Sequence, residues 1–332
     1  MADPWPPPMD SSAATSLPAS LAREPRDRFR RYAWGLLGYT LLVILFGAVV
    51  RITGSGAGCG QHWPSCNGEL LHLPRTLKTT IEYTHRATSG LSVLAIIALL
   101  TFAFRLYPLA HPVRRAAMLA GAMIVVEALI GAALVRLHLV ENDASLGRAL
   151  VLPLHLVSTA LLTAALTWCA YFTDQSAHAA RPLPAAARAL VLFAGLGVLL
   201  VSATGAVTAL GDTVYPVHAA GLAARLQEDQ GSTAHFLQRT RAVHPMLAIA
   251  VAAFVAYVAA VLPAYRTSRD VKRASLALAG SVSLQVFAGA LNVWLSAPGP
   301  LQVVHLFLAN LTWISLILLI AAARVGKDTS AV

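Results

Sequence analysis

The sequence predicts an all-α integral membrane protein with eight transmembrane helices, built as two repeated four-helix bundles. Of its 332 residues, 57% are hydrophobic and only 12% are charged, whereas soluble domains carry about 25% charged residues. Eight apolar runs each approach the roughly 20 residues that cross a bilayer as a helix. Glycine, histidine and polar positions of the first half recur in the second half at nearly constant offsets.

The basic charge is explained by membrane topology. A net charge of +10 in a soluble protein would suggest nucleic-acid binding. Here the basic residues are not interleaved with exposed aromatic residues, and the positive-inside rule accounts for them better. We therefore expect a lipid bilayer as the partner and no nucleic acid.

The first 31 residues are expected to form a disordered cytoplasmic tail. They are rich in Pro, Ser and Ala, a composition that cannot bury enough apolar surface to fold. No apolar core precedes the basic cluster, so the segment does not read as a secretory signal.

The eight runs follow one another with short connections. Each has the length and apolar content of a spanning helix. The expected spans are Tyr32–Val50, Ile81–Phe104, Arg115–Val135, Ala149–Phe172, Ala186–Leu210, Ala242–Leu262, Ala274–Leu295 and Leu301–Ala323.

An even number of spans puts both termini on one side. Sixteen of the 25 Lys and Arg residues fall on the side of the N-terminus and nine on the other, which predicts that both termini are cytoplasmic. The loop that carries Cys59 and Cys66 then lies outside, where disulfides persist.

The second half repeats the first with the same topology. The offset drops from 159 to 150 residues near the end, because the last two spans are joined by a shorter connection. We expect the glycines to allow close helix approach. The matched positions are Gly47 with Gly205, Glu127 with Gln285, Gly131 with Gly289, His85 with His244 and His155 with His305.

This repeat divides the chain into two bundles. The N-terminal bundle is expected at 32–172 and the C-terminal bundle at 186–324. A cytoplasmic linker at 173–185 would join them, and a cytoplasmic tail would follow at 325–332.

Four histidines begin the even-numbered spans and so lie toward their outer ends: His85, His155, His244 and His305. A single histidine there could be structural, but four at repeat-related positions indicate function. Two facing histidines in a four-helix bundle make a bis-imidazole haem site. Structural zinc would need four N or S ligands, and there is no CxxCH motif for covalent haem attachment.

The remaining histidines are expected to be solvated or interfacial. Outer loops hold His62, His72, His138, His218 and His235, and inner loops hold His111 and His178.

The two halves differ around their first histidine. Glu82 lies three residues before His85, whereas Arg241 lies three residues before His244, and the cysteine pair occurs only in the first outer loop. The presence of the carboxylate and the cysteine pair in the first half alone predicts different functions for the two haem sites. Glu82 has two interpretations, an ion pair with Arg86 at i,i+4 or a catalytic residue.

Two other side chains in the spans have simpler interpretations. Glu127 is a helix–helix hydrogen-bonding residue or a proton relay. Cys169, at the inner end of the fourth span, is expected to be an inert buried thiol.

From about Arg31 to Arg324, the chain closely resembles the haem A synthase family. Four features carry the resemblance jointly, in order and spacing. They are the Gly-rich turn at 54–60, the C-x6-C loop with Trp63 and Pro64, the Glu-x-x-His-Arg motif at 82–86, and the three later histidines. The chain lacks the second cysteine pair that some members carry.

The resemblance implies an oxidoreductase acting on a CH3 group. It would oxidise the C8 methyl of haem O to a formyl group and so supply haem A for terminal oxidases. Because an iron held by two histidines has no open position for oxygen, we expect successive hydroxylations with water-derived oxygen. Glu82 would be catalytic. His85 and His155 would hold the iron of substrate haem O, and His244 and His305 that of a prosthetic haem b. Cys59 and Cys66 would form a disulfide that orders the loop, acts in redox chemistry, or is a plain staple.

The resemblance also implies a bacterial inner-membrane location and further partners. These are haem O synthase (protohaem farnesyltransferase) as supplier, an unidentified electron acceptor, and a possible second copy of the chain. Two other functions stay open. A bis-histidine b-type cytochrome would only transfer electrons. A haem transporter would need discontinuous helices near the midplane, and corresponding spans show no paired Gly/Pro breaks.

Overall fold

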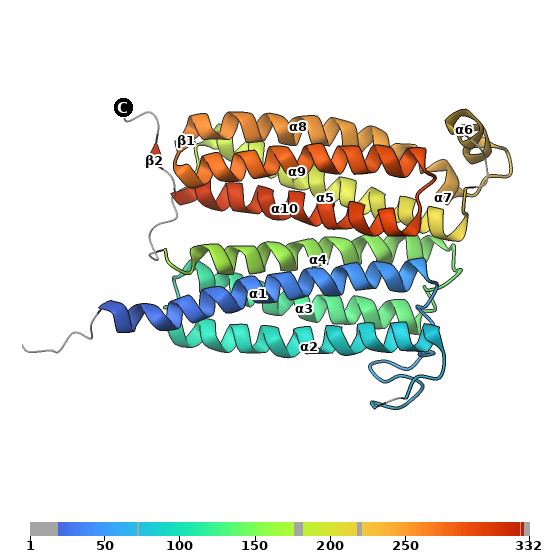
Figure 1. The fold of residues 1–332 in the computed structure, drawn as a ribbon, viewed down its shortest axis with the longest axis horizontal. Helices are drawn as coiled ribbons and strands as arrows, with labels where there is room; N and C mark the ends of the chain where they lie inside the picture. The colour runs from blue at the N-terminus through green and yellow to red at the C-terminus, as the bar shows by residue number, and fades with distance from the viewer. Residues whose placement is uncertain (1–18, 72, 176–181, 218–220, 326, 329–332) are drawn as a thin grey trace, which may run out of the picture.

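A computed structural model describes residues 19–71, 73–175, 182–217, 221–325 and 327–328 (Figure 1). Among these residues, eight helices are long and apolar enough to cross a membrane, which confirms the predicted fold class. Each predicted span lies within one of these helices, apart from a single end residue in two of the spans. The exceptions are Ala242 and Leu295, which cap helix ends.

The spanning helices have the following bounds. They are α1 (Ala19–Ile52), α2 (Leu77–Leu106), α3 (Pro112–Arg136), α4 (Leu146–Phe172), α5 (Ala185–Val214), α8 (Val243–Tyr265), α9 (Arg269–Trp294) and α10 (Gly299–Val325). Two short helices, α6 (Leu222–Gln230) and α7 (Phe236–Arg239), lie between α5 and α8, and β1 (Arg266–Thr267) pairs antiparallel with β2 (Lys327–Asp328).

The expectation of a disordered tail over 1–31 is wrong for its last part. Helix α1 begins at Ala19, so residues 19–31 are helical; residues 1–18 lie outside the described residues. Ion pairs one turn apart, between Glu24 and Arg28 and between Asp27 and Arg30, support this polar extension.

Polar side chains set the beginnings of several spanning helices. The Thr76 hydroxyl accepts a hydrogen bond from the Thr79 N–H at the start of α2, and Ser145 and Ser268 cap α4 and α9 in the same way. Such caps satisfy backbone donors that have no partner within the helix.

The helices form two groups that lie side by side (Figure 1). One contains α1–α4 and the other contains α5, α8, α9 and α10, while α4 and α10 contact each other between them. Whether the two groups are repeats of one unit stays a prediction from the sequence.

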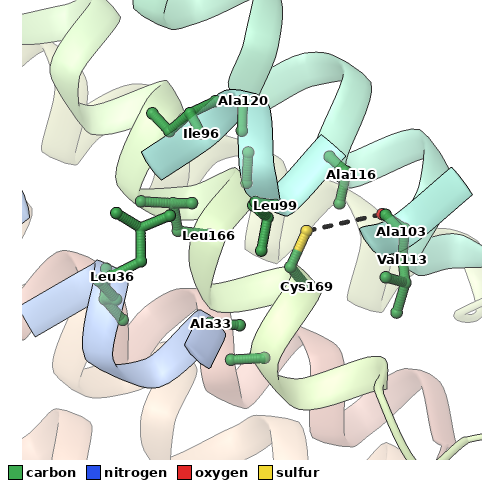
Figure 2. Close-up of a cluster of buried hydrophobic side chains, with 14 of the residues drawn as sticks. Ala33, Leu36, Ile96, Leu99, Ala103, Val113, Ala116, Ala120, Leu166 and Cys169 are labelled. Atoms are coloured by element: carbon green, nitrogen blue, oxygen red, sulfur yellow. Dashed lines mark hydrogen bonds between the residues drawn. The ribbon is translucent and has the colours of Figure 1, made fainter. Parts of the chain in front are cut away.

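Small and branched apolar side chains fill the core of the first group (Figure 2). Leu36, Ile96, Leu99 and Leu166 converge there from α1, α2 and α4. The Cys169 thiol is fully buried among them and donates to the Val113 carbonyl oxygen at 3.6 Å. This position fits the inert thiol expected from the sequence.

His111 is not the solvated loop residue that the sequence suggested. It is 4% exposed and caps α3, where its Nδ1 accepts from the Val113 N–H at 3.2 Å. Its Nε2 lies 2.9 Å from the Gln175 carbonyl oxygen, and the nearby Tyr107 hydroxyl donates to the Thr173 carbonyl oxygen. Burial lowers the pKa of His111 and raises the pKa of Tyr107 to about 12.

Candidate functional site

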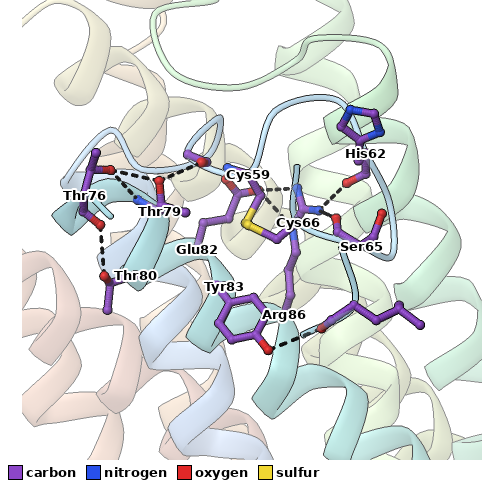
Figure 3. Close-up of a disulfide and its surroundings, with 12 residues drawn as sticks. Cys59, His62, Ser65, Cys66, Thr76, Thr79, Thr80, Glu82, Tyr83 and Arg86 are labelled. Carbon is purple, nitrogen blue, oxygen red and sulfur yellow. Dashed lines mark hydrogen bonds and ion pairs between the residues drawn. A yellow bond between two sulfur atoms is a disulfide. The ribbon is translucent and has the colours of Figure 1, made fainter. Parts of the chain in front are cut away.

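The first outer loop folds onto the start of α2. Cys59 and Cys66 form a disulfide, and both are buried (Figure 3). Gly58 packs so tightly on α2 that an added Cβ would lie 2.6 Å from the Lys78 carbonyl oxygen. The Thr79 hydroxyl donates to the Gly58 carbonyl oxygen at 2.9 Å. The glycine therefore lets the disulfide loop reach the helix that carries Glu82 and His85.

Glu82 joins α2 to this loop and is only 3% exposed. Its Oε2 accepts from the Cys59 N–H at 2.7 Å, and its Oε1 accepts from Arg86 Nε at 3.0 Å. Arg86 also donates to the carbonyl oxygens of Ser65, at 2.7 Å, and His62 (Figure 3). The i,i+4 ion pair expected as one interpretation of Glu82 is therefore present. The sequence did not reveal that both partners also bind the disulfide loop.

Three of the four repeat-related glycines lie directly against histidine rings. A Cβ added at Gly47 would lie 3.1 Å from His85 Cε1, and one added at Gly205 would lie 3.0 Å from His244 Cε1. The contact of Gly289 with His305 Cε1 is equivalent, at 3.1 Å, whereas an added Cβ at Gly131 would meet no atom within 4 Å. These glycines make room for imidazoles, a more specific role than close helix approach.

His244 and His305 face each other in the second group of helices. Their ring centroids are 6.4 Å apart and their planes are perpendicular. A metal bonded to one nitrogen of each ring, at roughly 2 Å per bond, requires centroids on the order of 6 Å apart. The Thr204 hydroxyl lies 3.2 Å from His244 Nδ1. The pair therefore fits a single iron held from both sides.

His155 on α4 contacts a carboxylate. Glu127 Oε2 lies 2.9 Å from His155 Nδ1, an ion-pair distance without the alignment of a hydrogen bond. The first group has its other histidine on α2, where the Phe46 ring packs edge-on against His85 at 5.9 Å between centroids. Both α2 and α4 pack against α1.

Buried ring nitrogens without hydrogen-bond partners are available for iron. The Nδ1 atoms of His85 and His305 are of this kind, whereas Nδ1 of His155 lies against the Glu127 carboxylate and leaves Nε2 of that ring for iron. Among the described residues, no three His, Cys, Asp or Glu side chains gather as a metal site would require. The facing pair His244 and His305 offers the two protein ligands that a haem iron needs.

Comparison with known proteins identifies the family. Residues 30–79 and 74–317 match the family described as cytochrome oxidase assembly protein, COX15-CtaA. The chain belongs to this family. A Thermus thermophilus protein named protoheme IX farnesyltransferase is 41% identical over 298 residues, covering 90% of this chain and 48% of that protein. The chain thus spans about half the length of such curated relatives.

Other relatives of this cytochrome oxidase assembly protein match a shorter stretch. A Bacillus cereus protein named heme A synthase is 40% identical over 95 residues, covering 29% of this chain and 30% of that protein. A Bacillus anthracis protein of the same name matches equally.

In this member of the COX15-CtaA family, the counterpart of Glu82 is a buried arginine with its own carboxylates. Arg241 is 4% exposed. It donates to Asp229 Oδ1 at 2.7 Å and lies 3.0 Å from Asp212 Oδ1. Arg225 joins the cluster from α6, 3.4 Å from Asp212. The sequence showed Arg241 in place of Glu82, but gave no signal that distant aspartates would pair with it.

The weaker histidines make other contacts, and His62 lies in the disulfide loop, where its backbone carbonyl oxygen accepts from Arg86. His235 caps α7, and His138 follows α3 in a left-handed backbone conformation. His72, His178 and His218 lie outside the described residues.

Proposed function

We propose that this chain carries haem A synthase activity, oxidising the C8 methyl of haem O to a formyl group. The observation that carries the proposal is the facing pair His244 and His305, whose ring centroids are 6.4 Å apart. Membership of the cytochrome oxidase assembly family and the relatives named heme A synthase support it.

The two histidine pairs would hold different haems. His85 and His155 would bind the iron of substrate haem O, next to Glu82. His244 and His305 would hold a resident haem b, which would supply a route for electrons from the substrate to an acceptor. Domains would follow this division, with the catalytic bundle at 32–172 and the haem b bundle at 186–324.

A bis-histidine iron has no open coordination position, so oxygen activation at that iron is disfavoured. We assign water as the oxygen source. Each of two hydroxylations replaces a methyl C–H bond by a C–O bond and releases two electrons and two protons. The resulting gem-diol loses water to give the aldehyde.

Glu82 is the residue we assign to catalysis. It lies one helical turn from His85, on the same face of α2. Its two oxygens accept hydrogen bonds from Cys59 and Arg86. That fixed negative charge favours stabilisation of positive charge developing at the substrate methyl over a role as a freely moving base. The disulfide would then orient Glu82 through the Cys59 N–H.

The proposed function also implies a cellular location and a source of the substrate. The chain would lie in a bacterial inner membrane with both termini cytoplasmic and the disulfide loop outside. Haem O would come from a protohaem farnesyltransferase. The relative of that name matches this chain over only 48% of its length, so farnesyl transfer does not carry over to this chain.

A conversion assay tests the proposal. Purified protein supplied with haem O and an oxidant should form hydroxylated haem O and then haem A. The hydroxylated product formed in water labelled with heavy oxygen should carry the label. Glu82→Gln should retain bound haem but form no formyl product. Its matched control is Glu141→Gln, which removes an outer-face carboxylate that pairs with Lys78 instead and should leave conversion unchanged. Normal haem A yield from Glu82→Gln would refute the role of Glu82.

A further inference from the structure

Each half of the molecule places a different polar side chain against its second histidine. Glu127 on α3 lies 2.9 Å from His155 Nδ1 on α4. At the matching position, 158 residues later in the sequence, Gln285 on α9 has its Nε2 3.2 Å from Nε2 of His305 on α10. The two histidines thus differ in whether a carboxylate or a neutral amide lies against the imidazole.

The Glu127 carboxylate is fixed in place by α4. Its Oε2 accepts from the Thr159 hydroxyl at 2.8 Å, and its Oε1 accepts from the Ser158 hydroxyl. Among the described residues, no Lys or Arg pairs with it, and its one ion-pair partner is His155. Its side chain is 13% exposed, so water screens the charge little. The negative charge is therefore directed at the histidine.

Gln285 makes no comparable contribution in the other half. An amide carries no net charge, and its Oε1 has no hydrogen-bond partner. His305 Nδ1 likewise has none. The His305 imidazole is therefore held beside a dipole and not beside a charge.

A carboxylate beside the outer nitrogen of a metal-bound histidine raises the basicity of the ligand. A more basic ligand and a nearby negative charge both favour the ferric over the ferrous iron, so they lower the reduction potential of a haem. We infer that Glu127 is a positioning and tuning residue that makes the haem held by His85 and His155 the electron donor to the haem held by His244 and His305. With both haems bound, one electron would leave the first haem and enter the second, with no proton transferred.

This inference rests on the proposed function, because it takes the four histidines as iron ligands. It deepens that function by giving the two sites a direction of electron flow. Oxidation of the substrate requires electrons to leave the first haem, and the difference between Glu127 and Gln285 drives them towards the second.

The test is a spectroelectrochemical titration of the purified protein with protohaem supplied to both sites. His155→Ala and His305→Ala variants assign each potential to its site. Glu127→Gln should raise the potential of the first haem by about 59 mV, which is a tenfold change in the reduction equilibrium constant for one electron. The reciprocal Gln285→Glu variant should lower the potential of the second haem in the same way. Ser158→Ala, which keeps the charge, should shift the first potential much less.

The outcomes separate this inference from the proposed function. If Glu127→Gln keeps the bis-histidine absorption spectrum but leaves the first potential unchanged, the tuning role is wrong while the haem sites stand. If the wild-type protein shows no bis-histidine haem that depends on His155, the proposed function fails and the inference fails with it. Should Glu127→Gln lose its haem, Gln285→Glu decides: an unchanged second potential overturns the inference.

Discussion

Replacing Gly205 with alanine places a methyl group against His244, and the result depends on whether iron holds that ring. The new Cβ would lie 3.0 Å from His244 Cε1, several tenths of an ångström inside ordinary van der Waals contact. In a helix interior, alanine is otherwise about 1 kcal/mol more favourable than glycine. A free imidazole can turn away from the methyl group, so without haem the variant should be as stable as the wild type or more stable.

With haem bound, the same change should be costly. A metal–nitrogen bond tolerates only about 0.2 Å of displacement, and the ring must move by more than that. Disturbing the support of a metal ligand typically costs 10–100-fold in affinity, so we expect about a tenfold loss of haem affinity. The equivalent Gly289→Ala change, 3.1 Å from His305 Cε1, should behave in the same way.

The assay combines haem stoichiometry with thermal unfolding in detergent, for protein with and without haem. Gly131→Ala is the matched control, because an added Cβ there meets no atom within 4 Å, and it should leave haem content unchanged. Full haem affinity in Gly205→Ala, or equal destabilisation of this variant with and without haem, would show that iron does not hold the His244 ring.

Two further changes test the contacts described above. Arg86→Met leaves the buried Glu82 carboxylate without its cation and should cost about 3–5 kcal/mol, seen as a lower unfolding temperature. The control Lys78→Met breaks a pair with Glu141 whose side chains are 58% and 38% exposed, so it should cost about 0–1 kcal/mol; equal losses would contradict the buried pair. Acidification should destabilise the wild type, because the folded-state pKa of His111 is lowered by burial. The stability that neutral His111 contributes is complete above pH 6.5, the pKa of histidine in the unfolded chain. It is lost as the pH falls from 6.5 through the lower folded-state pKa of His111. His111→Asn keeps a capping side chain and should remove this part of the pH dependence of the unfolding free energy. An unchanged pH profile in the variant would contradict the role of His111.

Much of the fold was predictable because hydropathy reports directly on spans. The eight apolar runs mark the eight spanning helices, since a bilayer requires each crossing segment to be long and apolar. The start of α1 was missed for the converse reason. Residues 19–31 are polar, and their helix is supported by local ion pairs such as Asp27 with Arg30, which hydropathy does not detect.

The candidate site was predictable only in part. Spacing alone indicated the Glu82–Arg86 pair, because residues four apart lie together on a helix. By contrast, the contact of Gly205 with His244 depends on how two helices are rotated against each other. The pairing of Arg241 with Asp229 depends on how a loop folds back. Neither follows from the periodicity of a single sequence.

The identity of the haems in the purified protein distinguishes haem oxidation from electron transfer alone. The protein would be produced together with an enzyme that makes haem O, and its haems would be extracted and identified by mass. We expect haem b together with haem O, its hydroxylated form or haem A, with haem O and its products lost in His155→Ala and haem b lost in His305→Ala. Haem b alone in both sites would contradict it and would instead indicate a cytochrome that only transfers electrons.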